Sequence, residues 1–203
     1  TNLETFAEVW ARSVGARPQQ TFLIFEGPSG HVTEWTYAQF DRQVARVASL
    51  LVERGVTSGS AVHLALTNSP TFVAIWLATT RLGAWIVPTD MPFVEIDESS
   101  GDFRVFPVAE FAHWPEPGTT DRAAVMFTSG TTGKPKGVEV TQANYAFAGR
   151  AMAAAAQLEA DDRQLVVLPL FHANAQYYSF ASAIWAGASV ALMPTFSASG
   201  FLP

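Results

Sequence analysis

The chain has 203 residues, 49% of them hydrophobic, which is enough to bury a core in one large domain or two small ones. Its formal net charge is −6 and it contains no basic cluster, so nucleic acid is not expected as a partner. It contains no cysteine, which excludes a disulfide framework and thiol catalysis.

Helical and extended patterns alternate along the first part of the chain. Thr36 and Gln39 form a capping-box pattern, and Ser69 followed by Pro70 is typical of a helix start. In chain order, these patterns predict a helix over Leu3–Val14, strands over Thr21–Glu26 and Val32–Trp35, a helix from Thr36 to Gly55, a strand over Ala61–Leu66, a buried helix from Ser69 to near Gly83, and a strand over Ala84–Pro88.

The second part of the chain continues the alternation after a region without a clear pattern, Asp90–Arg122. Thr141 is expected to cap an alanine-rich helix. The predicted elements are an apolar run over Ala123–Phe127, a helix over Gln142–Leu158, a strand over Gln164–Pro169, an aromatic-rich helix over Asn174–Ala186 and a strand over Ser189–Met193. This order predicts an α/β fold with a mostly parallel sheet.

No apolar stretch reaches the roughly 18 residues of a membrane span, and the N-terminus does not resemble a signal peptide. We therefore expect a cytoplasmic protein without a transmembrane segment. The acids Glu95, Asp97, Glu98 and Asp102 fit no metal-loop spacing, so they are interpreted as a solvated turn and no metal ligand is predicted.

Residues 128–137 read TSGTTGKPKG, which has the chemistry of a phosphate-binding loop. Glycines allow a phosphate to approach the main chain closely, and hydroxyls and a lysine add hydrogen-bond donors. The spacing is not that of a P-loop, because only two residues separate Gly130 from Gly133. A nucleophile elbow fails as well, because Ser129 precedes the first glycine. A glycine- and threonine-rich surface hairpin is the alternative without a function.

This loop resembles the signature loop of the adenylate-forming superfamily, which includes acyl-CoA synthetases. The stretch Trp35–Asp90 and the motif Pro169–His172 also resemble that family's patterns, in the same order and at similar spacing. The run Phe171–Tyr178 looks most like the carnitine/crotonobetaine-CoA ligase branch. The resemblance implies a layered sheet-and-helix fold, of which residues 1–203 would form an incomplete N-terminal domain.

The resemblance implies a ligase that activates a carboxylic acid with ATP and Mg²⁺ and transfers the acyl group to coenzyme A. Lys136 and Thr131 would be catalytic. His172 and Asn174 would bind the acid substrate. ATP would be held by Thr128, Ser129, Gly130, Thr131, Thr132, Gly133 and Lys136. Lys134 stands at the family's variable position, so Lys136 is the expected cation.

The chain departs from the family pattern in two ways. It ends before the family's adenine-binding motif and C-terminal lid domain, and the distance from Asp90 to Thr128 is short, which suggests a missing segment near residues 90–91. We therefore expect a partial enzyme that is inactive alone, with most Mg²⁺ ligands elsewhere. Two alternatives to this function stay open: transfer of the acyl group to an acyl carrier protein, and a non-catalytic nucleotide-binding or scaffold domain. The protein could also form a homodimer.

Overall fold

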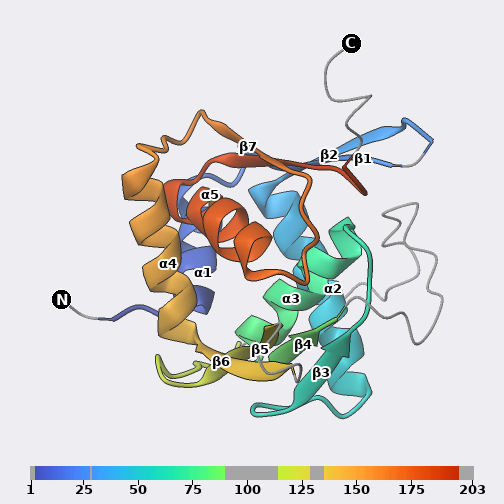
Figure 1. The fold of residues 1–203 in the computed structure, drawn as a ribbon, viewed down its shortest axis with the longest axis vertical. Coiled ribbons are helices and arrows are strands. Elements are labelled where there is room, and N and C mark those ends of the chain that lie inside the picture. Colours follow the sequence, from blue (N-terminus) through green and yellow to red (C-terminus); the bar gives the residue numbers. More distant parts are fainter. Residues whose placement is uncertain (1–2, 28, 90–113, 129–134, 197–203) are drawn as a thin grey trace.

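The computed structural model describes residues 3–27, 29–89, 114–128 and 135–196. Strands in these residues form two four-stranded sheets (Figure 1). Sheet A has the order β2-β1-β8-β7, and its strands are β1 (Thr21–Glu26), β2 (Val32–Thr36), β7 (Arg163–Val166) and β8 (Ser189–Leu192). Sheet B has the order β3-β4-β5-β6, and its strands are β3 (Ala61–Leu64), β4 (Trp85–Pro88), β5 (Arg122–Thr128) and β6 (Lys136–Thr141).

Both sheets are mostly parallel, as the alternation of helices and strands predicts. The parallel pairs are β1–β8, β7–β8, β3–β4 and β4–β5, and the two antiparallel pairs, β1–β2 and β5–β6, are hairpins. The α/β class is confirmed. The division of the strands between two sheets is a finding of the structure, because local patterns do not indicate which strands pair.

The helices lie between the two sheets (Figure 1). They are α1 (Phe6–Ala16), α2 (Tyr37–Glu53), α3 (Pro70–Arg81), α4 (Gln142–Ala155), the π-helix η2 (Ala175–Ala181) and α5 (Ser182–Ala186). Because each sheet turns one face toward this layer, helix α3 is buried along nearly its whole length, as its composition predicts. The central layer therefore forms the core that both sheets share.

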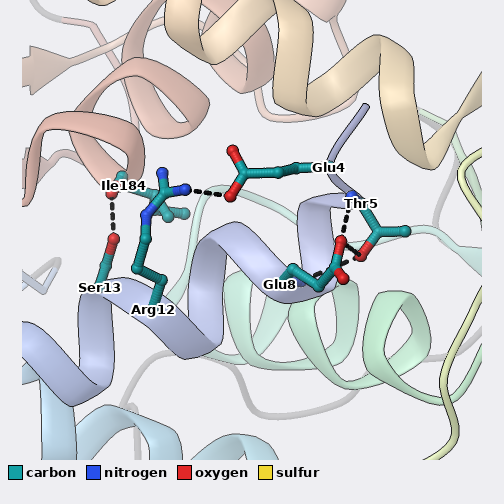
Figure 2. Close-up of polar contacts among 6 residues, drawn as sticks. All are labelled: Glu4, Thr5, Glu8, Arg12, Ser13 and Ile184. Carbon is teal, nitrogen blue, oxygen red and sulfur yellow. Dashed lines mark hydrogen bonds and ion pairs between the residues drawn. The ribbon is translucent and has the colours of Figure 1, made fainter. Parts of the chain in front are cut away.

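Helix starts are set by short-range capping contacts. Full capping boxes stand at Thr5 with Glu8, Thr36 with Gln39, and Thr141 with Asn144. Figure 2 shows the first of these, in which the Thr5 amide donates to Glu8 Oε2 at 2.7 Å and the Glu8 amide donates to Thr5 Oγ1 at 3.1 Å. Helix α1 therefore begins at Phe6, three residues later than the predicted start.

Two elements differ from the expected pattern. The strand β6 follows the glycine-rich loop directly, where no strand was predicted. The expected single helix over Asn174–Ala186 is instead a π-helix that continues into a short α-helix. Helix α4 packs closely on this π-helix at Gly149, where a methyl group would lie only 2.6 Å from the carbonyl oxygen of Ala181. Single π-helical turns are rare and often occur at functional sites.

We predict that Gly149→Ala destabilises the fold, because the methyl group has no space against the Ala181 carbonyl. Overpacking of this kind typically costs about 1–3 kcal/mol of unfolding free energy. Urea denaturation measures the change. The control is Gly15→Ala in helix α1, where nothing lies within 4 Å of the added methyl group. That change should be neutral or stabilising by up to about 1 kcal/mol. Equal effects of the two substitutions would contradict the close-packing argument.

Candidate functional site

The glycine-rich loop connects two antiparallel strands. Thr128 ends β5 and Lys136 begins β6, and the two residues are paired across the hairpin. The Thr128 hydroxyl donates to the Lys136 carbonyl oxygen at 3.5 Å. The two ends of the loop are thus fixed by sheet B. The predicted site residues Ser129, Gly130, Thr131, Thr132 and Gly133 lie outside the described residues, so their roles stay predictions.

The side chain of Lys136 is exposed. Within the described ranges its ammonium group has no ion-pair partner, whereas Arg81 pairs with Asp41 at 2.6 Å and Arg122 pairs with Glu139. A cation without an internal partner can form charge-assisted hydrogen bonds with a phosphate group. Lys136 therefore has the exposure and charge that its predicted role requires.

The position of this hairpin in the sheet follows from the parallel pairing. Strands β3, β4 and β5 run in the same direction, so Leu64, Pro88 and Thr128 lie at one edge of sheet B. The carboxyl edge of a parallel sheet is where ligands bind in open α/β folds. Strand β6 is an edge strand of sheet B, and its residues 136–139 are exposed.

His172 and Asn174 follow strand β7. The His172 amide donates to the Pro169 carbonyl at 3.1 Å, and its ring lies against Phe171 with the ring centroids 4.4 Å apart. Both predicted residues are exposed, and the Asn174 side chain does not cap the π-helix that it precedes. The structure thus places the two residues at the carboxyl edge of sheet A, available to a ligand.

A cavity of about 380 Å³ adjoins the segment that carries His172. Its described lining comes from the residues that follow β3, β7 and β8 and is mostly apolar: Ala65, Leu66, Thr67, Asn68, Val167, Leu168, Pro169, Phe171, Pro194, Thr195 and Phe196. Phe171 contributes to the wall, whereas His172 and Asn174 do not. Apolar pockets with a few polar groups are typical of small-molecule sites. Sequence reasoning missed this cavity, although the carboxyl ends of predicted parallel strands were the signal for it.

Asn68 joins the two sheets at this cavity, and it was not predicted as a site residue. It follows β3 of sheet B, and its side-chain amide donates to the carbonyl oxygens of Leu168 at 3.0 Å and Met193 at 3.1 Å, which follow β7 and β8 of sheet A. The carboxyl edge of sheet A is thereby linked to β3, whose end shares the carboxyl edge of sheet B with the glycine-rich hairpin.

The described residues contain no group of three or more His, Asp or Glu side chains that could hold a metal ion. The acids Glu95, Asp97, Glu98 and Asp102 lie outside them. A search of the described helices also finds none with the length and apolar character that a membrane span requires.

Comparison with solved structures shows the fold. ATP-bound MatB from Rhodopseudomonas palustris superposes with a TM-score of 0.78 at 22% identity, covering 94% of this chain and 46% of that protein. The N-terminal domain of FACL13 from Mycobacterium tuberculosis, solved with an inhibitor, gives a TM-score of 0.79 at 23% identity. The match covers 97% of this chain and 58% of that one. The layered arrangement is therefore that of the N-terminal part of these proteins.

Comparison with curated proteins finds crotonobetaine/carnitine–CoA ligases. The protein from Salmonella arizonae is 28% identical over 244 aligned positions, which cover 96% of this chain and 47% of the relative. The Salmonella typhimurium protein is 27% identical, and the alignment covers 98% of this chain and 48% of that protein. The chain spans about half the length of these relatives. The AMP-binding enzyme family matches residues 10–97 and 93–202. With nearly the whole chain matched, the protein belongs to the AMP-binding enzyme family.

Proposed function

We propose that the protein containing this chain is an acid–thiol ligase that forms an acyl-adenylate from ATP and a carboxylic acid and then passes the acyl group to coenzyme A. The observation that carries the proposal is the exposed Lys136, which follows the glycine-rich loop at the start of β6 and has no ion-pair partner among the described residues. The similarity to CoA ligases supports the reaction class.

The reaction proceeds in two displacements. A carboxylate oxygen of the acid attacks the α-phosphorus of ATP, and the bond to pyrophosphate breaks. A thiol then adds to the acyl carbonyl carbon, its proton is lost to solvent, and AMP leaves. Negative charge collects on the departing pyrophosphate, and a preorganised cation stabilises it. Lys136 is the described residue for this task, with Thr128 beside it and Ser129 to Gly133 as the proposed backbone and hydroxyl donors.

The acid is proposed to lie on the other side of the site. His172 and Asn174 are exposed at the carboxyl edge of sheet A, beside the apolar cavity. A cavity with this lining suits the apolar part of a carboxylic acid. Mg²⁺ is proposed to accompany ATP, but no described cluster of acids would hold it, so we assign it no ligand.

Residues 1–203 are proposed to be part of an N-terminal domain from which a segment near residues 90–91 is missing. The alignment with the Salmonella arizonae ligase supports this, because it extends over 244 positions, more than the 203 residues available here. The family matches the chain in two segments that overlap at residues 93–97. The intact mass of the purified protein would test the proposal, since a mass near 21.9 kDa contradicts a longer chain.

We predict that the complete gene product releases pyrophosphate from ATP only when a suitable carboxylic acid is present. A panel of crotonobetaine, carnitine, hexanoate and 3-hydroxybenzoate with ATP and Mg²⁺ tests this by ATP–pyrophosphate exchange and by acyl-CoA formation. Exchange together with acyl-CoA formation supports the ligase. Exchange without acyl-CoA points to a carrier protein as acceptor. ATP binding without exchange for any acid points to a non-catalytic binding protein.

We predict that Lys136→Ala lowers kcat/KM for ATP by about 10²–10³-fold in that exchange assay, which is typical of losing one preorganised transition-state donor. The matched control is Lys134→Ala in the same loop. Lys134 stands at the family's variable position, so its loss should change kcat/KM by no more than about fivefold, or about 1 kcal/mol. Equal effects of the two substitutions would contradict the assignment of Lys136.

Folding of the Lys136 variant has to be intact for that comparison. Because the side chain is exposed, Lys136→Ala should change the unfolding free energy by no more than about 0.5 kcal/mol. Val140 lies in the same strand and is buried. Val140→Ala should cost about 1–3 kcal/mol and shows that urea denaturation detects changes in β6.

A further inference from the structure

The turn Leu168–His172 leaves strand β7 and forms one wall of the apolar cavity. Leu170 stands at its centre and is 1% exposed. A buried backbone amide or carbonyl without a hydrogen-bond partner is strongly unfavourable. Since this turn is neither helix nor strand, the buried backbone groups of Leu170 need partners from elsewhere in the molecule.

Two side-chain amides supply these partners. The Leu170 amide donates to Asn68 Oδ1 at 2.7 Å, and the Leu170 carbonyl accepts from Gln176 Nε2 at 2.5 Å. Asn68 comes from the segment after β3, and Gln176 comes from the π-helix. They therefore hold the turn from two different elements.

Each amide has one orientation that satisfies all its partners. Asn68 Nδ2 faces the carbonyl oxygens of Leu168 and Met193, so its Oδ1 must accept from Leu170. Gln176 Oε1 accepts from the Tyr145 hydroxyl at 2.5 Å, so its Nε2 must donate. Burial raises the pKa of Tyr145, which keeps that hydroxyl protonated and able to donate.

These contacts form one buried chain from α4 through the π-helix and the turn to β3. Tyr145 and Gln176 are fully buried, and Asn68 is 5% exposed. Asn68, Leu168, Pro169 and Phe171 also line the cavity, so the polar chain lies directly behind the cavity wall. His172 is held against the same turn by the hydrogen bond that its backbone N–H donates to the Pro169 carbonyl.

We propose that Asn68 and Gln176 are positioning residues, whose amides hold the Leu168–His172 turn in place and thereby shape the acid-binding side of the site. This inference rests on the proposed function. The glycine-rich hairpin is fixed separately, by pairing of β5 with β6. Loss of either amide should therefore weaken use of the acid and leave use of ATP nearly unchanged.

Gln142 provides a matched control. It is also a fully buried amide with two partners: its Nε2 donates to the Thr80 carbonyl at 2.9 Å, and its Oε1 accepts from the Ala7 amide at 3.3 Å. It joins α1, α3 and α4 and makes none of the contacts to the turn. Gln142→Ala removes the same chemistry from the same kind of environment without touching the cavity wall.

The first experiment is hydrogen exchange of the complete gene product, followed on peptides that cover residues 167–174. Asn68→Ala and Gln176→Ala should accelerate exchange in this segment at least tenfold relative to Gln142→Ala. Equal exchange in all three variants would overturn the proposal, because the turn would then be held without the two amides.

The second experiment is acid-dependent ATP–pyrophosphate exchange by the complete gene product, with the most active acid of the panel as the probe. Misplacement of a site by about 1 Å can cost 10²-fold in rate. We expect Asn68→Ala and Gln176→Ala to raise KM for the acid at least tenfold, with KM for ATP within twofold. Gln142→Ala should leave both constants within twofold. Parallel changes in both KM values, or acid KM values no larger than that of Gln142→Ala, would overturn the proposal.

Tyr145→Phe replaces the alanine variants in this kinetic test if those variants fail to fold. It removes only the hydroxyl that orients Gln176 and keeps the aromatic ring, and it should raise the acid KM about threefold without changing the KM for ATP. An unchanged acid KM counts against the proposal. If the wild-type protein activates no acid of the panel, the proposed function fails. The hydrogen-exchange experiment alone then decides whether the two amides hold the turn.

Discussion

The stack of three aromatic rings at the centre of the helix layer is the contact on which both sheets depend. Phe6 of α1 stacks on both Trp76 of α3 and Tyr145 of α4, with ring centroids 5.3 and 5.1 Å apart, and the Trp76 and Tyr145 rings contact each other at 5.4 Å. Each aromatic pair contributes about 0.5–1.5 kcal/mol beyond its buried area. Helix α3 connects β3 to β4 within sheet B, whereas α4 leads from β6 of sheet B to β7 of sheet A, and α1 also contacts α5. This stack therefore joins the two sheets into one body.

Polar contacts in the core also join the helices to one another. Ser13 of α1 donates to the Ile184 carbonyl in α5 at 2.6 Å (Figure 2), and Tyr145 uses its ring for the stack and its hydroxyl for the bond to Gln176. The residue that joins the helices thus also touches the chain of amides behind the cavity. Core packing and site geometry are therefore coupled through Tyr145.

Local features of the sequence predicted the helix starts well, because capping contacts span only three residues. Thr36, Ser69 and Thr141 cap helices as expected. The partition into two sheets could not be predicted, because β1 pairs with β8 from the far end of the chain. Strand β6 was missed because its exposed first half, with Lys136 and Gly137, lacks a strand-like composition, although Val138 and Val140 alternate as a strand requires.

The part of the candidate site that could be predicted is the part whose residues form one contiguous motif. Lys136 and Thr128 stood out because glycines, hydroxyls and lysines cluster around them, and the structure adds that they are paired across a hairpin. Asn68 gave no signal, since one asparagine in a loop is unremarkable until Leu168, Leu170 and Met193 are seen around it. A residue whose partners lie a hundred positions away can be recognised only in the folded chain.

The pairing of β1 with β8 has a consequence for how the protein is made. Leu23 pairs with Val190, so the β1–β2 hairpin gains β8 as its parallel neighbour only after the intervening residues 24–189 have been synthesised. Synthesis proceeds at about 5–20 residues per second, and long-range pairing is slow to form. Sheet B draws its strands from residues 61–141 and can assemble earlier. The nascent chain therefore carries an open apolar strand edge at β1 for several seconds, until β8 has been synthesised and can protect that edge from aggregation.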